Sequence, residues 1–395
     1  MTENLYILLS FSISFAVVFF AIPKIITVAN AKKLFDVPTH RSANQEKIIP
    51  NLGGVAIFSG FFISTIISLE GFDINKIIGL LLTSLIMFLI GLKDDTIGLS
   101  PYKKLIGELF VAFYLVTLCN IRFTNLHGIF GINEINYSLS MFISVITIIG
   151  LINAFNLIDG IDGLAAGVGT VISCVYGFLF LYFGQLEYSI VSFSITGALI
   201  AFFFYNVFGK ANKIFMGDTG SLTIGVIFAV LTIWFNEIIP INNIHSTIWT
   251  SPAISLAIMI VPVIDIIRVF SIRLSQKVSP FSPDMNHIHH QLIKITKNHL
   301  HASIIIIFVN IIFIFLSFGF IELIGNNILF VLILTMGFSL AYIPTLINKI
   351  REPENETIEV SDDHTVLHLH LIKSIKYQDV PEDKADEPKK NNSAV

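Results

Sequence analysis

Eleven apolar segments separated by polar stretches constrain this chain more than any other feature. They lie at about 5–29, 53–69, 76–92, 105–121, 138–152, 164–183, 188–206, 220–235, 252–270, 302–321 and 327–347. A helix that crosses a bilayer needs roughly 20 apolar residues, and backbone polar groups inside the bilayer must be hydrogen-bonded within the protein. Only 13% of the residues are charged, against about 25% in soluble domains. The sequence therefore predicts an all-α integral membrane protein, a polytopic bundle of about eleven transmembrane helices.

Basic residues predict how the chain crosses the membrane. The loops after the odd-numbered spans hold 13 Lys and Arg residues, and the opposite loops hold 2. Because cytoplasmic loops carry the excess of positive charge, we expect these odd-numbered loops in the cytoplasm and the N-terminus outside. Four polar motifs, at 91–95, 153–163, 215–221 and 282–290, fall on the same side. This asymmetry predicts a site at the cytoplasmic face for a charged, soluble substrate.

The last 47 residues differ from the rest in composition. Residues 349–395 hold 7 Lys and Arg and 11 Asp and Glu residues, and they are polar and Pro-rich. Such segments bury too little apolar surface to fold alone. We expect a transmembrane domain at 1–348 and an acidic, disordered cytoplasmic tail at 349–395. The chain has no basic stripe of the kind that binds nucleic acid, so we expect no nucleic-acid partner.

The stretch NAFNLIDGIDG, residues 153–163, spaces four polar residues three apart between two apolar spans: Asn153, Asn156, Asp159 and Asp162. A straight α-helix would point the first and last of them to opposite faces. We expect a break at Gly160 and Gly163, with the two amides ending one span and the two acids leading into the next. Their oxygens suit Mg²⁺ or a nucleotide. A polar helix–helix seam is the alternative, but acids beside a membrane favour a functional site.

Two more acidic motifs border apolar spans. In GLKDD, Asp94 and Asp95 end the third span, and adjacent carboxylates need positive charge nearby. Their functional roles would be Mg²⁺ ligand or general base, and the alternative is solvation of a helix end. In MGDTGS, Asp218 precedes the eighth span. There the glycines permit close approach of a ligand, and a helix N-terminus offers N–H groups to a phosphate. A helix-capping Asp would look similar.

Three histidines, His287, His289 and His290, follow the stretch SPFSPDMN. Adjacent helical residues diverge by 100°, so we expect a loop rather than a helical zinc pair. Their expected role is phosphate contact or proton transfer, and the alternative is three surface histidines. Asp265 and Arg268, three residues apart at the inner end of the ninth span, are expected to form a structural ion pair that orients this segment.

Taken in order, the motifs resemble those of the polyprenyl-phosphate N-acetylhexosamine-1-phosphate transferases over nearly all of residues 1–347. They read LFDVPTHR, IIPNLGG, GLKDD, NAFNLIDGIDGLAAG, FMGDTGSL, PVIDIIRVF and SPFSPDMNHIHH. The last two resemble the WecA/TagO-type branch, the undecaprenyl-phosphate N-acetylglucosamine-1-phosphate transferases. One departure lies in the first cytoplasmic loop. That branch has the pattern R-K-x-H there, whereas this chain has Ser42 after Arg41 and no histidine near Asn44.

The resemblance implies a reaction and its participants. An N-acetylglucosamine-1-phosphate, or a related 2-acetamido-sugar-1-phosphate, would pass from a UDP-sugar to polyprenyl (undecaprenyl) phosphate, releasing UMP. The lipid-diphosphate sugar would start a cell-envelope polysaccharide. The resemblance also implies Mg²⁺ as cofactor, with Mn²⁺ as a substitute, a place in the bacterial inner (plasma) membrane bilayer, and leaves a homodimer open.

The resemblance assigns roles to residues of this chain. Asp94, Asp95, Asp218, His289 and His290 would be catalytic, with Asp94 a candidate base. A base is not physically required, because a phosphate with a second pKa near ~6 is mostly dianionic at neutral pH. Asp218 and Asn156 would hold the metal. The remaining substrate contacts would come from Arg41, Lys104, Asn153, Asn156, Asp159, Asp162 and His287.

Two other functions compete with this interpretation. The first is phospho-N-acetylmuramoyl-pentapeptide transferase activity, but that branch has a tight HHH run and a lysine soon after the paired aspartates, which this chain lacks. The second is an ion-coupled transporter. Transporters tend to show inverted repeats and acids near the bilayer midplane, whereas the acids here are predicted at one face.

Overall fold

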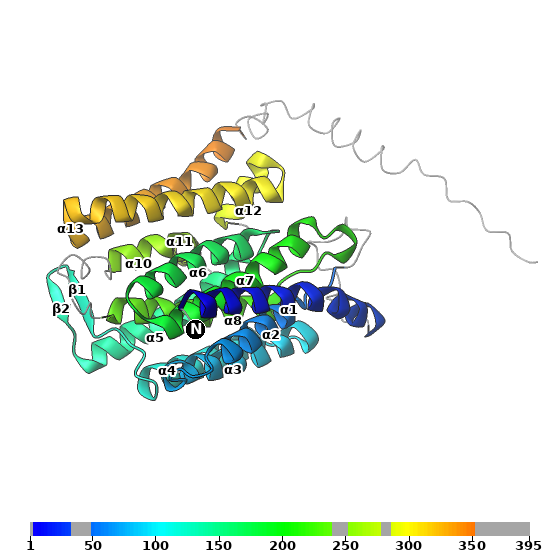
Figure 1. Cartoon of the computed structure of the whole chain (residues 1–395). Helices are drawn as coiled ribbons and strands as arrows, with labels where there is room; N and C mark the ends of the chain where they lie inside the picture. The colour runs from blue at the N-terminus through cyan, green and yellow to red at the C-terminus, as the bar shows by residue number, and fades with distance from the viewer. Residues whose placement is uncertain (1–2, 33–48, 239–251, 278–285, 352–395) are drawn as a thin grey trace, which may run out of the picture. The chain divides into compact units, whose positions relative to one another are not determined.

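The computed structural model describes residues 3–32, 49–238, 252–277 and 286–351. They form helices α1 (Glu3–Lys32), α2 (Gly53–Ser68), α3 (Asn75–Ile97), α4 (Pro101–Thr117), α5 (Tyr137–Ile158), α6 (Leu164–Tyr182), α7 (Leu186–Phe208), η1 (Lys210–Asn212), α8 (Gly217–Glu237), α10 (Pro252–Ile258), α11 (Ile260–Ser275), α12 (Ile288–Thr296) and α13 (His299–Arg351). Strands β1 (Asn125–Ile129) and β2 (Ile132–Glu134) pair as an antiparallel hairpin. Figure 1 shows these elements. The predicted boundary after residue 348, and the disorder of the tail, stay predictions.

Each of the eleven predicted spans is helical, which confirms an all-α membrane protein but not the number of crossings. Within the described ranges, seven helices are long and apolar enough to cross a bilayer, or eight if α10 and α11, bent by 83°, form one span. Helices α2 and α4 have only 16 and 17 residues. The last two predicted spans form the single 53-residue α13, which is broken at Gly325. The count of about eleven stays a prediction.

Helix α8 lies at the centre of the bundle, and 89% of its most apolar 18-residue stretch is buried. Helices α2, α3 and α5 pack against it. Small residues bring these helices close, as is common between helices in membranes. A Cβ on Gly54 of α2 would lie 2.1 Å from the backbone nitrogen of Gly220, and one on Gly91 of α3 would lie 2.5 Å from the carbonyl oxygen of Asp218. The N-terminus of α8 is therefore fixed by its neighbours.

The β1–β2 hairpin closes the opposite end of α8, where the sequence predicted only a loop. Thr124 donates two hydrogen bonds, from its N–H and its hydroxyl, to the carboxylate of Glu237 at the end of α8. Asn326 and Asn327, next to the break in α13, donate to the carbonyls of His127 and Gly128. The hairpin and the residue before it therefore connect the end of α8 to the break in α13 at Gly325.

The close contact at Gly54 leads to a first prediction. Gly54→Ala should lower the free energy of unfolding by about 1–3 kcal/mol, the usual cost of overpacking, because the new methyl group would meet rigid backbone. Thermal unfolding followed by size-exclusion chromatography would measure the loss. Gly319→Ala is the matched control, because a Cβ there has nothing within 4 Å. Equal stability of the two variants would contradict this packing.

Candidate active site

The candidate site lies at the N-terminus of α8, where two motifs distant in the sequence pair through their backbones. The N–H of Phe215 donates to the carbonyl of Pro50, and the N–H groups of Gly53 and Gly54 donate to Phe215 and Met216 at 2.9 and 2.8 Å. Gly217 follows with φ of 70°, a conformation that favours glycine. A Cβ there would also lie 2.1 Å from the carbonyl oxygen of Asn51. The IIPNLGG segment thus shapes the turn that presents Asp218.

Asp95, at the end of α3, caps α8. Its Oδ1 accepts from the N–H of Asp218 at 2.9 Å and from the amide of Asn51 at 3.4 Å. Its Oδ2 accepts from the N–H and the hydroxyl of Thr219 at 2.8 and 2.5 Å. A carboxylate at a helix N-terminus is stabilised by the helix dipole. Asp95 thus occupies the N–H groups of Asp218 and Thr219, and the expectation that the N-terminus of α8 binds a phosphate stays a prediction.

Lys104, near the start of α4, joins the two other acids. Its Nζ lies 2.6 Å from Oδ2 of Asp94 and also contacts Oδ2 of Asp218. The N–H of Leu99 donates to the other oxygen of Asp94 at 2.5 Å. Asn156 of α5 donates from Nδ2 to Oδ1 of Asp218 at 2.7 Å. The positive charge predicted beside the paired aspartates is thus Lys104, and Asp94, Asp218 and Asn156 meet around it.

The chain breaks where the 153–163 motif predicts. Helix α5 ends at Ile158, Asp159 follows as its C-cap, and Gly163 adopts φ of 78° before α6 begins. The four polar side chains do not converge on one point. Asn156 reaches Asp218, whereas Asn153 donates to Glu108 of α4 at 2.5 Å. The break separates the two acids from both amides.

Asp159 and Asp162 lie in different electrostatic surroundings. Burial raises the pKa of Asp159 well above its ordinary value, and the charges of Asp218, Asp95 and Asp162 raise it further. Burial also acts on Asp162, but hydrogen bonds from His299 and Lys213 outweigh it and lower the pKa of that carboxyl. Lys213 Nζ lies 2.6 Å from its Oδ2. These surroundings therefore favour the protonated, neutral form of Asp159. They favour the ionised form of Asp162, which ties Lys213 and the start of α13 to the turn.

The HIHH segment is helical, so the predicted loop was wrong. His287 is the N-cap of α12, and His289 and His290 lie in its first turn. The predicted Asp265–Arg268 ion pair was wrong as well. Asp265 accepts from His287 at 2.8 Å and from the N–H of Ile288 at 2.9 Å. Arg268 donates to the carbonyl of Asn286 and to Thr345. Both residues still anchor the start of α12, each through its own partners.

His289 reaches the acidic turn from the other side. A Cβ on Gly160 would lie 2.3 Å from its Nε2, so the imidazole packs against the backbone between Asp159 and Asp162. The first glycine of the motif is thus needed for close approach. Among the predicted site residues, Arg41 lies outside the described residues.

Sequence reasoning missed Glu108. Its side chain is buried on α4, one turn after Lys104, and accepts from Asn153. A glutamate inside an apolar span is itself a signal of function, and that signal was available in the sequence. Asn51 and Thr219, which donate to Asp95, were also missed. In their motifs only the glycines and Asp218 were considered.

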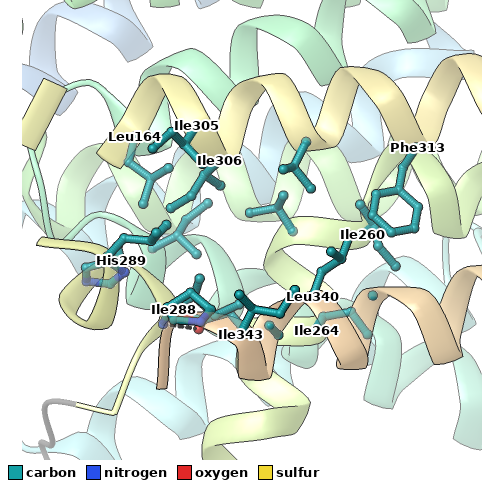
Figure 2. Close-up of a pocket in the computed structure, with 18 residues that line it drawn as sticks. Leu164, Ile260, Ile264, Ile288, His289, Ile305, Ile306, Phe313, Leu340 and Ile343 are labelled. Carbon is teal, nitrogen blue, oxygen red and sulfur yellow. Dashed lines mark hydrogen bonds between the residues drawn. The ribbon is translucent and has the colours of Figure 1, made fainter. Parts of the chain in front are cut away.

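An apolar cavity of about 220 Å³ begins beside this site. Figure 2 shows His289 and Ile288 at one end, with Ile305, Ile306 and Phe313 from the first half of α13 and Leu340 and Ile343 from its second half. Residues of α11 complete the wall. The cavity extends from His289 between the two halves of α13, and its walls are almost entirely hydrocarbon.

Comparison with known proteins assigns the family. The family model for glycosyl transferase family 4 matches residues 77–236. A protein of Haemophilus influenzae, undecaprenyl-phosphate alpha-N-acetylglucosaminyl 1-phosphate transferase, is 31% identical over 310 residues, which cover 77% of this chain and 84% of that protein. The chain belongs to glycosyl transferase family 4. Proteins of the same name from Pasteurella multocida and Salmonella typhi are 31% and 27% identical, over 76% and 66% of this chain and 83% and 69% of theirs.

The resemblance stated from the motifs is therefore confirmed. The matched family region holds Asp94, Asp95, Lys104, Asn156 and Asp218. Helices α12 and α13, which supply the histidines and most of the cavity, lie beyond it.

Proposed function

We propose that this protein transfers N-acetylglucosamine-1-phosphate from UDP-N-acetylglucosamine to undecaprenyl phosphate and releases UMP. An oxygen of the lipid phosphate attacks the phosphorus attached to the sugar. The bond from that phosphorus to the bridging oxygen breaks, and UMP leaves with the electron pair. The observation that carries the proposal is the meeting of Asp94, Lys104, Asn156 and Asp218 at one end of the bundle, in a chain similar to transferases of that name.

The acidic donors suit Mg²⁺, which prefers carboxylate and carbonyl oxygens. Four carboxylates, from Asp94, Asp95, Asp159 and Asp218, interact here with one another or with the ammonium of Lys104. Buried like charges are costly unless compensated. We assign Asp218 and the carboxamide oxygen of Asn156 as the groups that would hold the ion. When bound, Mg²⁺ would neutralise charge on the phosphates during transfer. Mn²⁺ is the expected substitute.

The other site residues receive roles consistent with their positions. Lys104 is placed to contact a phosphate, because its ammonium lies between Asp94 and Asp218. Asp95 holds the α8 turn through four hydrogen bonds, so the catalytic role proposed for it would require these bonds to rearrange. His289 and His290 would contact the diphosphate, and Asn153, Asp159 and Asp162 the nucleotide. The contacts predicted for Arg41 and His287 remain part of the proposal.

The apolar cavity would take the first isoprene units of the acceptor. An apolar cavity of about 150 Å³ binds a benzene-sized molecule, so about 220 Å³ admits one or two five-carbon units. Ala341→Leu would fill it from α13. We expect the KM for undecaprenyl phosphate to rise roughly tenfold, since about 0.8 kcal/mol is lost for each methylene left unburied.

Steady-state kinetics with both substrates would test the cavity. The KM for the UDP-sugar should not change. Ser339→Leu, a larger side chain at an exposed position of the same helix, is the matched control. Equal acceptor KM values for the two variants would remove the cavity from the proposal.

We place the N-terminus outside and the 349–395 tail in the cytoplasm of a bacterial inner membrane, on the 13-to-2 distribution of basic residues. In a background with Cys119 and Cys174 replaced by serine, an impermeant maleimide should label Asn133→Cys in β2 from outside intact cells. It should label Ser100→Cys, between α3 and α4, only after the membrane is opened. The reverse pattern would invert the topology.

Purified protein in detergent with undecaprenyl phosphate and Mg²⁺ tests the reaction itself. UDP-N-acetylglucosamine, other UDP-2-acetamido sugars and UDP-N-acetylmuramoyl-pentapeptide should be offered in parallel. We expect UMP release and lipid product with an acetamido sugar, dependent on the lipid. Turnover with the pentapeptide donor alone would assign the peptidoglycan branch instead, and no lipid-dependent UMP release with any donor would refute the proposal.

A further inference from the structure

Asp265 connects α11 to the histidine segment by two hydrogen bonds. Asp265 is 2% exposed. Oδ2 lies 2.8 Å from Nδ1 of His287, and Oδ1 accepts from the N–H of Ile288 at 2.9 Å. Both oxygens therefore contact the first residues of α12, which follow more than twenty residues later in the chain. This pairing holds the start of α12 in place.

The pairing also determines where His287 carries its proton. An ionised carboxylate only accepts hydrogen bonds, so Nδ1 of His287 is the protonated nitrogen. The hydrogen bond made by one ring nitrogen sets the role of the other. Asp265 thereby fixes both the tautomer and the ring plane of His287.

The orientation of the His287 ring constrains the two histidine rings next to it. Its imidazole stacks on that of His289 with centroids 5.4 Å apart and planes 16° apart, and the rings of His289 and His290 are 4.3 Å apart. His289 is 1% exposed and packs against Gly160. A rotation of His287 would therefore press His289 into the turn that holds Asp159 and Asp162.

We propose that Asp265 is a positioning residue for the transfer reaction. Through its hydrogen bond to His287 and the stacked rings, it holds His289 against the acidic turn. Asp265 contacts no reacting group itself. The proposal rests on the proposed function for its kinetic consequence, whereas its structural core, the Asp265–His287 pair, is open to a separate measurement.

A metal ion is the competing use of the same residues. Asp265, His287 and His289 offer ligand atoms within 4.8 Å of one another. However, both oxygens of Asp265 and Nδ1 of His287 are already engaged in hydrogen bonds. The buried guanidinium of Arg268 contacts the carbonyl of Asn286, the residue before His287. A cation bound here would have to replace the hydrogen bonds of Asp265 and His287. It would also lie near the positive charge of Arg268.

The test replaces the carboxylate by its isosteric amide. In Asp265→Asn, the new NH₂ group would donate to Nδ1 of His287 and move the ring proton to Nε2. We expect kcat to fall roughly 10–100-fold, by analogy with the loss of partners that orient metal-binding histidines, with a smaller change in the KM for the UDP-sugar. In ¹⁵N spectra of histidine-labelled protein, the Nδ1 and Nε2 shifts of His287 should exchange, with the signals assigned through His287→Gln.

Matched controls separate positioning from general destabilisation. Glu237→Gln makes the same carboxylate-to-amide change at the hairpin end of α8, where the carboxylate also accepts two hydrogen bonds, and it should keep kcat. His287→Gln retains a donor toward Asp265 but removes the ring, so its kcat should fall as in Asp265→Asn. The double variant should be no slower than either single one. If Asp265→Asn does not fold, His287→Gln carries the test.

Three results would overturn the inference. The first is an active Asp265→Asn protein with wild-type kcat. The second is an unchanged His287 tautomer in that variant. The third is a stoichiometric transition metal in the wild-type protein that the variant loses. If the wild type transfers no sugar phosphate from any donor, the proposed function fails, and the ¹⁵N measurement still tests the Asp265–His287 pair.

Discussion

Asp218→Asn is expected to abolish sugar-phosphate transfer, lowering kcat by roughly 10³-fold or more, and to lower the affinity for Mg²⁺. The carboxylate contacts the ammonium of Lys104 through one oxygen and the amide of Asn156 through the other. The amide replacement removes the charge that a hard cation needs. It also leaves a donor NH₂ facing either the ammonium or another amide. Catalysis of phosphoryl transfer is mostly charge neutralisation and positioning, so both losses act on the same step.

A Mg²⁺ titration of turnover, together with a Mg²⁺ binding measurement, separates these effects. Asp73→Asn is the matched control, because Asp73 is an exposed acid whose side chain accepts from Asn75 at the start of α3, and it should behave as wild type. Near-normal turnover of Asp218→Asn at saturating Mg²⁺ would refute a direct role. If turnover is lost but Mg²⁺ affinity is normal, the metal ligands would have to be assigned to the other acids of the site.

The helices and the main acidic cluster were predictable because both depend on rules that act along the chain. A long apolar segment in a bilayer must be helical, so every predicted span was found as helix. Acids beside a membrane are rare unless functional, and this rule pointed to Asp94 and Asp218. Asn156 was predicted from the spacing of its motif, and the three side chains meet in one place. The break at Gly163 followed from the spacing of the motif.

Contacts between distant segments were not predictable in the same way. The role of Asp95 as the cap of α8 depends on how deeply α3 approaches Gly217, which no local pattern encodes. Arg268 lies three residues from Asp265, and that spacing suggested an ion pair. The pairing failed because α12 and α13 offer both residues other partners, Ile288 and His287 for the acid and Asn286 and Thr345 for the arginine. Tertiary packing decided each of these cases.

Gly160→Ala is expected to lower kcat by roughly 10²-fold. A Cβ at this position would lie 2.3 Å from Nε2 of His289, so the imidazole must move away from the turn between Asp159 and Asp162. In the proposed function His289 contacts the diphosphate, where it would stabilise charge that passes to the leaving UMP. Losing one such donor costs about 10²–10³-fold. The KM for the UDP-sugar should change less, because that interaction strengthens in the transition state.

A double-mutant cycle shows whether the methyl group acts through His289. His289→Ala alone should lower kcat by a similar factor, and adding Gly160→Ala should cost little more, since residues in contact are not additive. Gly150→Ala is the matched control within α5. A Cβ there has nothing within 4 Å, and alanine should stabilise that helix by about 0.5–1 kcal/mol with kcat unchanged. If the Gly160 and His289 effects instead multiply, the glycine serves the backbone of the acidic turn directly, and His289 is not held by this contact.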